Sequence, residues 1–289
     1  MPATTPRILA VGAAGAFAGL VVPELARRGV TVRGLIRDPT AADRVRTNGA
    51  AEVAVGDLRD FASLEAALQG VEAVFYIAPA FIPNEVEIGK NVVEAARQAG
   101  VRRIVFSSVI DPILSALPNH AAKAPVEEAI LASGMEYAFL HPTLFFQNFA
   151  GSWPAVVETG VYGEPWSAET RFTRVDYRDV AEVAAIALTE DRLVFGTFEL
   201  CAEGNLNRHE VTALMSDVTG RKIEAVGPHL DNSGHDGGET QASPMQPMFD
   251  WYDTHGLLGN PLILRSILGR EPRTLRAYFE ELARNTNSQ

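Results

Sequence analysis

Short apolar runs alternate with amphipathic stretches along the first half of the chain. The runs are rich in β-branched and aromatic residues, which favours strands. Apolar positions in the stretches between them recur at helical spacing, which favours helices. The expected strands are 7–11, 31–36, 51–55, 73–77, 103–107 and 137–140, and the expected helices are 15–28, 61–69, 85–99 and 121–133.

The order of these elements predicts the fold class. Strand and helix recur within about thirty residues, the spacing of βαβ units. We therefore expect an α/β protein with a Rossmann-type doubly wound parallel sheet and a smaller C-terminal α+β lobe. The sheet domain is expected at 1–157, with 175–201 returning to the sheet, and the small lobe at 202–289.

The second half of the chain is less regular. Asp179 is expected to cap a helix that runs to Leu188, followed by a strand at 197–200. Asn207 is expected to cap a helix that runs to Thr219, and 275–283 forms another. Residues 229–247 are expected to form a long loop, either a lid or an ordinary exposed loop.

Composition narrows the class of protein and its partners. The 289 residues are 47% hydrophobic and 21% charged, as in globular proteins, and the net charge of −11 disfavours nucleic acid and anionic lipid as partners. Cys201 is the only cysteine, which favours a reducing, cytoplasmic setting. No long apolar run, signal segment, metal-ligand spacing or nucleophile elbow is present, so we expect no membrane span, metal site or hydrolase chemistry.

A glycine-containing turn follows the first strand and precedes the first helix. Gly12 permits a tight turn, and Gly15 lets the backbone approach a diphosphate at the helix N-terminus. A tight turn that binds nothing is the alternative. Pro23 is expected to remove one hydrogen bond from the helix and to bend it. The expected binding segment is Gly12, Ala13, Ala14, Gly15, Ala16 and Phe17.

The ends of the next strands suggest which dinucleotide would bind. Arg37 ends the second strand where NAD sites commonly carry an acid, and a guanidinium there can bind a 2′-phosphate. NADP(H) is therefore favoured over NAD(H). Asp57 and Leu58 are placed near the adenine, although Asp57 could equally cap a turn. Ile77 and Ala78 follow as small side chains that would allow backbone to pass near the ribose.

Several short motifs, in this order and spacing, resemble those of the NmrA-like family of atypical short-chain dehydrogenases/reductases, which includes quinone-oxidoreductase-like proteins. They are Gly12-Ala13-Ala14-Gly15, Arg37, Gly56-Asp57-Leu58, Ser107-Ser108, Lys123 with Glu127, His141-Pro142, Phe146-Gln147-Asn148 and Asp179-Val180-Ala181. The resemblance implies an NADP(H)-binding Rossmann domain and a small lobe that closes over a substrate.

The resemblance also implies where catalysis would occur. Lys123 matches the lysine of the family, which would contact the nicotinamide ribose, and Ser107 and Pro142 would border the cofactor. The tyrosine that the wider superfamily uses as a proton donor is replaced here by Asn119, and its serine by Val109. His120 could supply the proton instead, or could be an ordinary helix-start histidine. His141 is expected to be structural.

Candidate substrate contacts follow the sixth strand. Phe145, Phe146, Phe149 and Trp153 could stack on a flat acceptor or could form core. Asn148 and Tyr177 are further candidates for the cleft, together with Val109.

Two functions fit these residues. The first is an NADPH-dependent oxidoreductase that reduces a small organic acceptor, such as a quinone, an enone or an iminium, without the Ser-Tyr relay. The second is a catalytically silent NADP(H)-sensing protein that acts through a protein partner. In either case the protein could form a homodimer.

Overall fold

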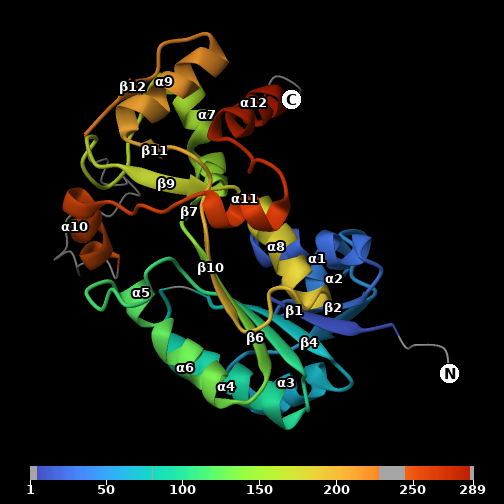
Figure 1. Cartoon of the computed structure of the whole chain (residues 1–289). Coiled ribbons are helices and arrows are strands. Elements are labelled where there is room, and N and C mark those ends of the chain that lie inside the picture. Colours follow the sequence, from blue (N-terminus) through green and yellow to red (C-terminus); the bar gives the residue numbers. More distant parts are fainter. Residues whose placement is uncertain (1–4, 80, 228–244, 287–289) are drawn as a thin grey trace, which may run out of the picture. The chain divides into compact units, whose positions relative to one another are not determined.

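The computed structural model describes residues 5–79, 81–227 and 245–286 (Figure 1). The chain divides into two compact units, which we describe separately. Residues 143–157, assigned to the first domain from the sequence, group with the second unit. Of the loop expected at 229–247, residues 229–244 lie outside the described residues. The first unit comprises Met1–Ile113, Asn119–Pro142 and Tyr177–Glu199, and the second Leu114–Pro118, Thr143–Asp176 and Leu200–Gln289.

A seven-stranded sheet forms the centre of the first unit, in the order β10-β6-β5-β4-β1-β2-β3. Strands β1 to β6 pair in parallel, which confirms the expected fold class. The order reverses between β1 and β4, the position where doubly wound sheets bind ligands. The strands are β1 Arg7–Val11, β2 Thr31–Ile36, β3 Glu52–Val55, β4 Ala73–Ile77, β5 Arg103–Ser107, β6 Glu136–Pro142 and β10 Gly196–Leu200.

Helices cover both faces of this sheet (Figure 1). Helices α1 and α8 pack against each other on one face, and α3, α4 and α6 cover the other around an apolar core. This arrangement buries the strands on both sides, which explains their nearly continuous apolar sequences. The elements are α1 Ala18–Arg27, η1 Pro39–Ala41, α2 Ala42–Thr47, α3 Phe61–Leu68, α4 Glu85–Gln98, α5 Pro118–Ala121, α6 Ala124–Ala132 and α8 Tyr177–Thr189.

Three helix starts differ from the sequence prediction. Helix α1 begins at Ala18 rather than at residue 15, because the glycine turn takes the intervening residues. The helix expected over 121–133 begins only at Ala124, as α6, and a separate short helix, α5, ends at Ala121, since Pro125 cannot donate a hydrogen bond to the carbonyl of Ala121. Helix α8 begins at Tyr177, so Asp179 lies inside its first turn and is not the cap.

The second unit contains two small sheets and a helical core. Strands β7, β9 and β11 form one sheet, and β8 pairs with β12 in the other. Asn207 caps α9 in a reciprocal capping box with Glu210, which confirms the predicted cap. The elements are β7 Leu144–Phe145, η2 Phe146–Asn148, α7 Phe149–Thr159, β8 Val161–Tyr162, β9 Phe172–Val175, β11 Asn205–Leu206, α9 Arg208–Thr219, β12 Glu224–Ala225, α10 Gln246–His255, α11 Leu262–Leu268 and α12 Leu275–Thr286.

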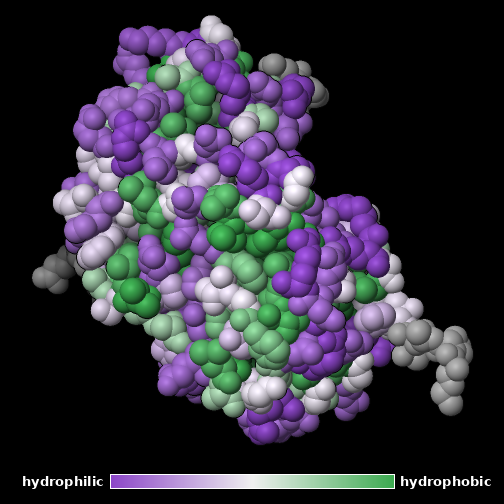
Figure 2. All heavy atoms as spheres, in the orientation of Figure 1, coloured by the Kyte–Doolittle hydropathy of each residue, from purple (hydrophilic) through white to green (hydrophobic). Residues whose placement is uncertain are grey.

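On the face drawn in Figure 1, polar residues cover much of the outer helices, with apolar residues gathered in smaller patches between them (Figure 2). Ile113, Leu131 and Phe195 are among the exposed apolar side chains. In the part of the chain that the structure describes, every helix is too short or too polar to cross a bilayer.

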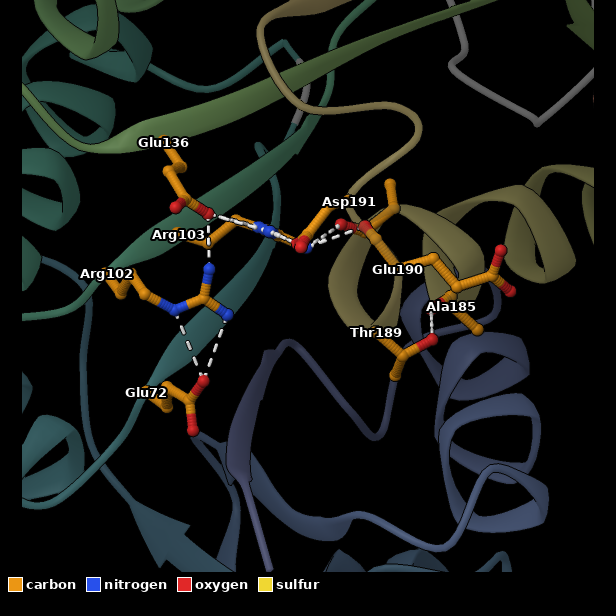
Figure 3. A network of polar contacts seen from close by, with 9 residues as sticks. Glu72, Arg102, Arg103, Glu136, Ala185, Thr189, Glu190 and Asp191 are labelled. Atoms are coloured by element: carbon orange, nitrogen blue, oxygen red, sulfur yellow. Dashed lines mark hydrogen bonds and ion pairs between the residues drawn. The ribbon is translucent and has the colours of Figure 1, made fainter.

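Arg103 ties helix α8 to the start of strand β5 (Figure 3). Its guanidinium is buried and donates to the carbonyls of Ala187 and Glu190 at 3.0 and 2.8 Å. It also donates to Glu136 at 2.8 Å and to Asp191 at 2.5 Å. Because these carbonyls end α8, the arginine satisfies groups that the helix itself leaves without donors. The sheet therefore holds the helix that carries Tyr177.

Replacing Arg103 with alanine should destabilise the protein by about 3 kcal/mol, since the buried carbonyls would lose their donor and Glu136 would lose one of its two arginine partners. The matched control is Arg102→Ala. Arg102 also binds Glu136 but is largely exposed, so its loss should cost about 1 kcal/mol or less. Denaturant unfolding of the two variants measures the difference. Equal losses would contradict the anchoring role of Arg103.

Candidate functional site

The turn between β1 and α1 is held against strand β2. Gly12 has a φ of 73°, and the amides of Gly12 and Ala13 both donate to the carbonyl of Leu35 at 3.1 Å. Gly15 then donates to the carbonyl of Gly12 at 2.7 Å. The amides of Ala14 and Ala16 donate to no acceptor among the described residues. These two amides lie just before a helix N-terminus, where an anion is favoured.

Pro23 lies inside α1 and leaves the carbonyl of Gly19 without its helical donor. The helix nevertheless continues, because the side-chain amide of Asn48 donates to that carbonyl at 2.5 Å. Gly49, with a φ of 114°, lies close against Ala26 on the same helix. The end of α2 therefore supplies the hydrogen bond that the proline removes.

A cavity of about 490 Å³ lies between the glycine turn and α2. One of its walls carries Arg44, whose guanidinium donates to the carbonyl of Ala14 at 3.1 Å. Arg44 and Asn48 do not stand out in the sequence, because no helix is expected at α2 from its pattern. A second basic residue seven positions after Arg37 was the available signal. The lining residues are Ala13, Ala14, Gly15, Ala16, Gly19, Leu20, Arg44, Val45, Thr47 and Asn48.

Arg37 and Asp57 follow the neighbouring strands β2 and β3. The Arg37 side chain is exposed and makes no hydrogen bond or ion pair with any described residue. Asp57 instead accepts hydrogen bonds from the backbone and guanidinium of Arg59, at 2.7 to 3.0 Å, and these bonds hold the pKa of its carboxyl far below the usual range. The contacts of Asp57 are therefore those of a residue that stabilises a turn, the alternative given for it in the sequence. Leu58 packs against the core.

Lys123 forms a buried ion pair with Glu85. Lys123 is the N-cap of α6, and Glu85 is the first residue of α4. A cation at a helix N-terminus is opposed by the helix dipole, and a buried charge is costly unless it is paired. Glu85 therefore stabilises the ammonium at this position.

His120 is fully buried beside this ion pair. Its Nδ1 lies 3.1 Å from the carbonyl of Asp111. Burial lowers the pKa of the imidazole, with a smaller contribution from the charge of Lys123 in the same direction. At neutral pH the ring is therefore mostly uncharged, which weakens it as a proton source.

Ser107 ends β5 and Ser108 follows it, and the two side chains point to opposite faces of the sheet. Ser107 accepts a hydrogen bond from the buried hydroxyl of Tyr177 at 2.9 Å, on the face covered by α8. The ring of Tyr177 also packs on Phe17 of the glycine turn, with centroids 5.0 Å apart. Tyr177 thus connects α8, β5 and the turn, and its side chain is fully buried.

Ser108 lies on the other face, toward α6. Its hydroxyl donates to Oε1 of Glu127 at 2.5 Å, and Nε2 of His141 lies 2.9 Å from the same oxygen. The backbone amide of Ser108 donates to the carbonyl of Leu140, which continues the pairing of β5 with β6 beyond the last strand pair. The three side chains are largely buried.

The other residues predicted for the site differ in burial and in location. Ile77 ends β4 and pairs with Ser107, Ala78 follows it, and Pro142 ends β6. Val109 is half-buried. In the second unit, Phe146 and the neighbouring Phe149 and Trp153 form core, whereas Phe145 is half-buried and Asn148 is exposed. Among the described residues, no cluster of histidine, cysteine and carboxylate side chains could hold a metal ion.

The sequence profile of the NmrA-like family matches residues 4–280. The chain belongs to this family. The NAD(P)H azoreductase of Xenophilus azovorans is 28% identical over 281 residues, which cover 94% of this chain and 96% of that protein. Quinone oxidoreductase 2 of Escherichia coli (strain K12) is 27% identical over 222 residues, covering 75% and 76%. The Citrobacter sp. triphenylmethane reductase, solved in complex with NADP(H), shares the fold with a TM-score of 0.83 at 23% identity, covering 96% of this chain and 99% of that one.

The hydrogen bond from Asn48 to Gly19 can be tested with a double-mutant cycle. Asn48→Ala should cost about 0.5–1 kcal/mol in the unfolding free energy, because it leaves the Gly19 carbonyl without a protein donor. In a Pro23→Ala background the new backbone amide can donate to Gly19, so Asn48→Ala should then cost much less. Denaturant unfolding of the four proteins gives the coupling. Additive losses would show that Asn48 does not substitute for the amide that proline lacks.

Proposed function

We propose that the protein is an NADPH-dependent oxidoreductase that reduces a small organic acceptor, such as a quinone, an azo compound or an activated enone. One observation carries the proposal: uncommitted amides and Arg44 border a cavity at the start of α1 in a chain of the NmrA-like family. Its relatives include an NAD(P)H azoreductase and a quinone oxidoreductase. Bound NADPH would supply the hydride.

The residues around the cavity fit a phosphorylated dinucleotide. The amides of Ala14 and Ala16 would donate to the diphosphate. Arg37 makes no hydrogen bond or ion pair with a described residue, and Arg44 is held only by a backbone carbonyl, so both guanidiniums are available for a 2′-phosphate. No acid occupies the end of β2 in the position that usually binds a ribose diol. NADP(H) is therefore the preferred cofactor.

Lys123 would stabilise negative charge that develops on the acceptor or would bind the nicotinamide ribose. Its ammonium is fixed by Glu85 at the carboxyl edge of the sheet, on the face where α6 begins. Preorganised charge of this kind is a large contribution to catalysis in sites that exclude water. Asn119 and Val109 do not provide an acid, so the preferred acceptors are those that accept hydride readily.

Replacing Arg37 with alanine should weaken NADPH binding by about 10- to 100-fold, the loss of a charge-assisted contact, and should change NADH binding by about twofold or less. Isothermal titration calorimetry with both cofactors measures this. Arg46→Ala is the control, since Arg46 lies on α2 and already pairs with Asp43. Equal weakening of both cofactors would contradict the assignment of the 2′-phosphate.

Replacing Lys123 with methionine should lower the kcat of NADPH oxidation by about tenfold or more with quinone and azo acceptors. The double variant K123M/E85Q separates loss of the cation from the burial of an unpaired Glu85, and should be as slow as K123M. Lys90→Ala, an exposed lysine of α4, is the control. If the wild-type protein binds NADPH but none of the acceptors tested leads to its oxidation, an NADP(H)-sensing role would replace the enzymatic one.

A further inference from the structure

A second cluster of buried polar groups lies on the α6 face of the sheet, apart from the Lys123 and Glu85 ion pair. Its members are Ser108, which follows β5, Glu127 of α6 and His141 of β6. In a parallel sheet, adjacent residues on neighbouring strands point to the same face. Ser107 pairs with Leu140, so Ser108 and His141 are the next pair, and both reach Glu127.

The hydrogen bonds of this cluster converge on Glu127. One carboxylate oxygen of Glu127 meets both the hydroxyl of Ser108 and Nε2 of His141. The ring of His141 is also close enough to Asp111 for their charges to interact, and Asp111 in turn interacts with Glu199 on β10. Carboxylates therefore face this imidazole from α6 and from the segment after β5, with Glu199 behind.

The cluster lies at the carboxyl edge of the central sheet. Ser108 follows the last residue of β5 at the carboxyl edge of the sheet, where ligands of doubly wound proteins bind. It lies on the face where α6 carries both Lys123 and Glu127, four residues apart and therefore one turn apart. Ser107, by contrast, is turned away and bonded to Tyr177.

We propose that Ser108, Glu127 and His141 form a proton relay that replaces the absent tyrosine, with Ser108 as the group that meets the acceptor. The inference rests on the proposed reductase function. As the acceptor takes a hydride, Ser108 gives its hydroxyl proton to the atom that gains negative charge. Glu127 passes a proton to the serine oxygen and takes one from Nε2 of His141, which regains it from solvent. Ser108 is then a catalytic residue, and Glu127 and His141 act through it.

Two dyes distinguish a proton relay from a structural cluster. An azo group takes one hydride and one proton to become a hydrazine, whereas a cationic triarylmethane dye is neutralised by the hydride alone. Ser108→Ala, Glu127→Gln and His141→Asn should therefore lower kcat with the azo dye methyl red by about 100-fold, the usual contribution of a positioned acid. Their kcat with malachite green should stay within about twofold of the wild type.

Three further measurements complete the test. Deuterium oxide should slow wild-type turnover of methyl red and not of malachite green. NADPH affinity by calorimetry should be unchanged in all three variants. The imidazole N–H proton of His141 should give a downfield NMR resonance that Glu127→Gln moves upfield. His209→Asn is the control, because His209 pairs with Glu169 at the same 2.9 Å but on the exposed surface of the second unit.

The outcomes separate the two hypotheses. Equal losses with both dyes, or no loss with either, overturn the relay while leaving the reductase function standing. A wild-type protein that binds NADPH and reduces neither dye nor any quinone overturns the proposed function and the relay with it.

Discussion

The hydrogen bonds from Gly12 and Ala13 to the carbonyl of Leu35 determine the geometry of the candidate site. Two amides are used to close the turn onto β2, so the next amides along the chain point elsewhere. The parallel arrangement of β1 and β2 brings the acceptor carbonyl to this place. The same arrangement brings the ends of β4, β5 and β6, with Lys123 and Ser108, to one edge. Sheet order thus places the glycine turn and the polar clusters at the same edge of one unit.

Much of the first unit could be predicted from the sequence because its strands are buried on both faces. Burial demands continuous apolar runs, and these runs mark β1, β2, β4 and β5 to the residue. Local chemistry also located the cap at Asn207, whose bonding partner is three residues away. The prediction at Asp179 was wrong for the opposite reason. Tyr177 begins α8, and its contacts with Ser107 and Phe17 are distant in sequence.

The candidate site was predicted less completely, for a related reason. Motif spacing located Lys123 and the glycine turn, but ion pairs between distant residues leave no periodic signal. Glu85 is 38 residues from Lys123, and His141 is 14 residues from Glu127. The short strands of the second unit were missed because two to four residues carry too little pattern to distinguish a strand from a loop.

The amide of Asn48 that completes α1 belongs to an asparagine followed by glycine. This dipeptide is chemically labile, because the small following residue lets the backbone nitrogen attack the side-chain carbonyl and expel ammonia. The resulting carboxylate can only accept hydrogen bonds. Ageing of the protein would then set an anion against the Gly19 carbonyl and add negative charge beside the cavity that is suited to phosphate.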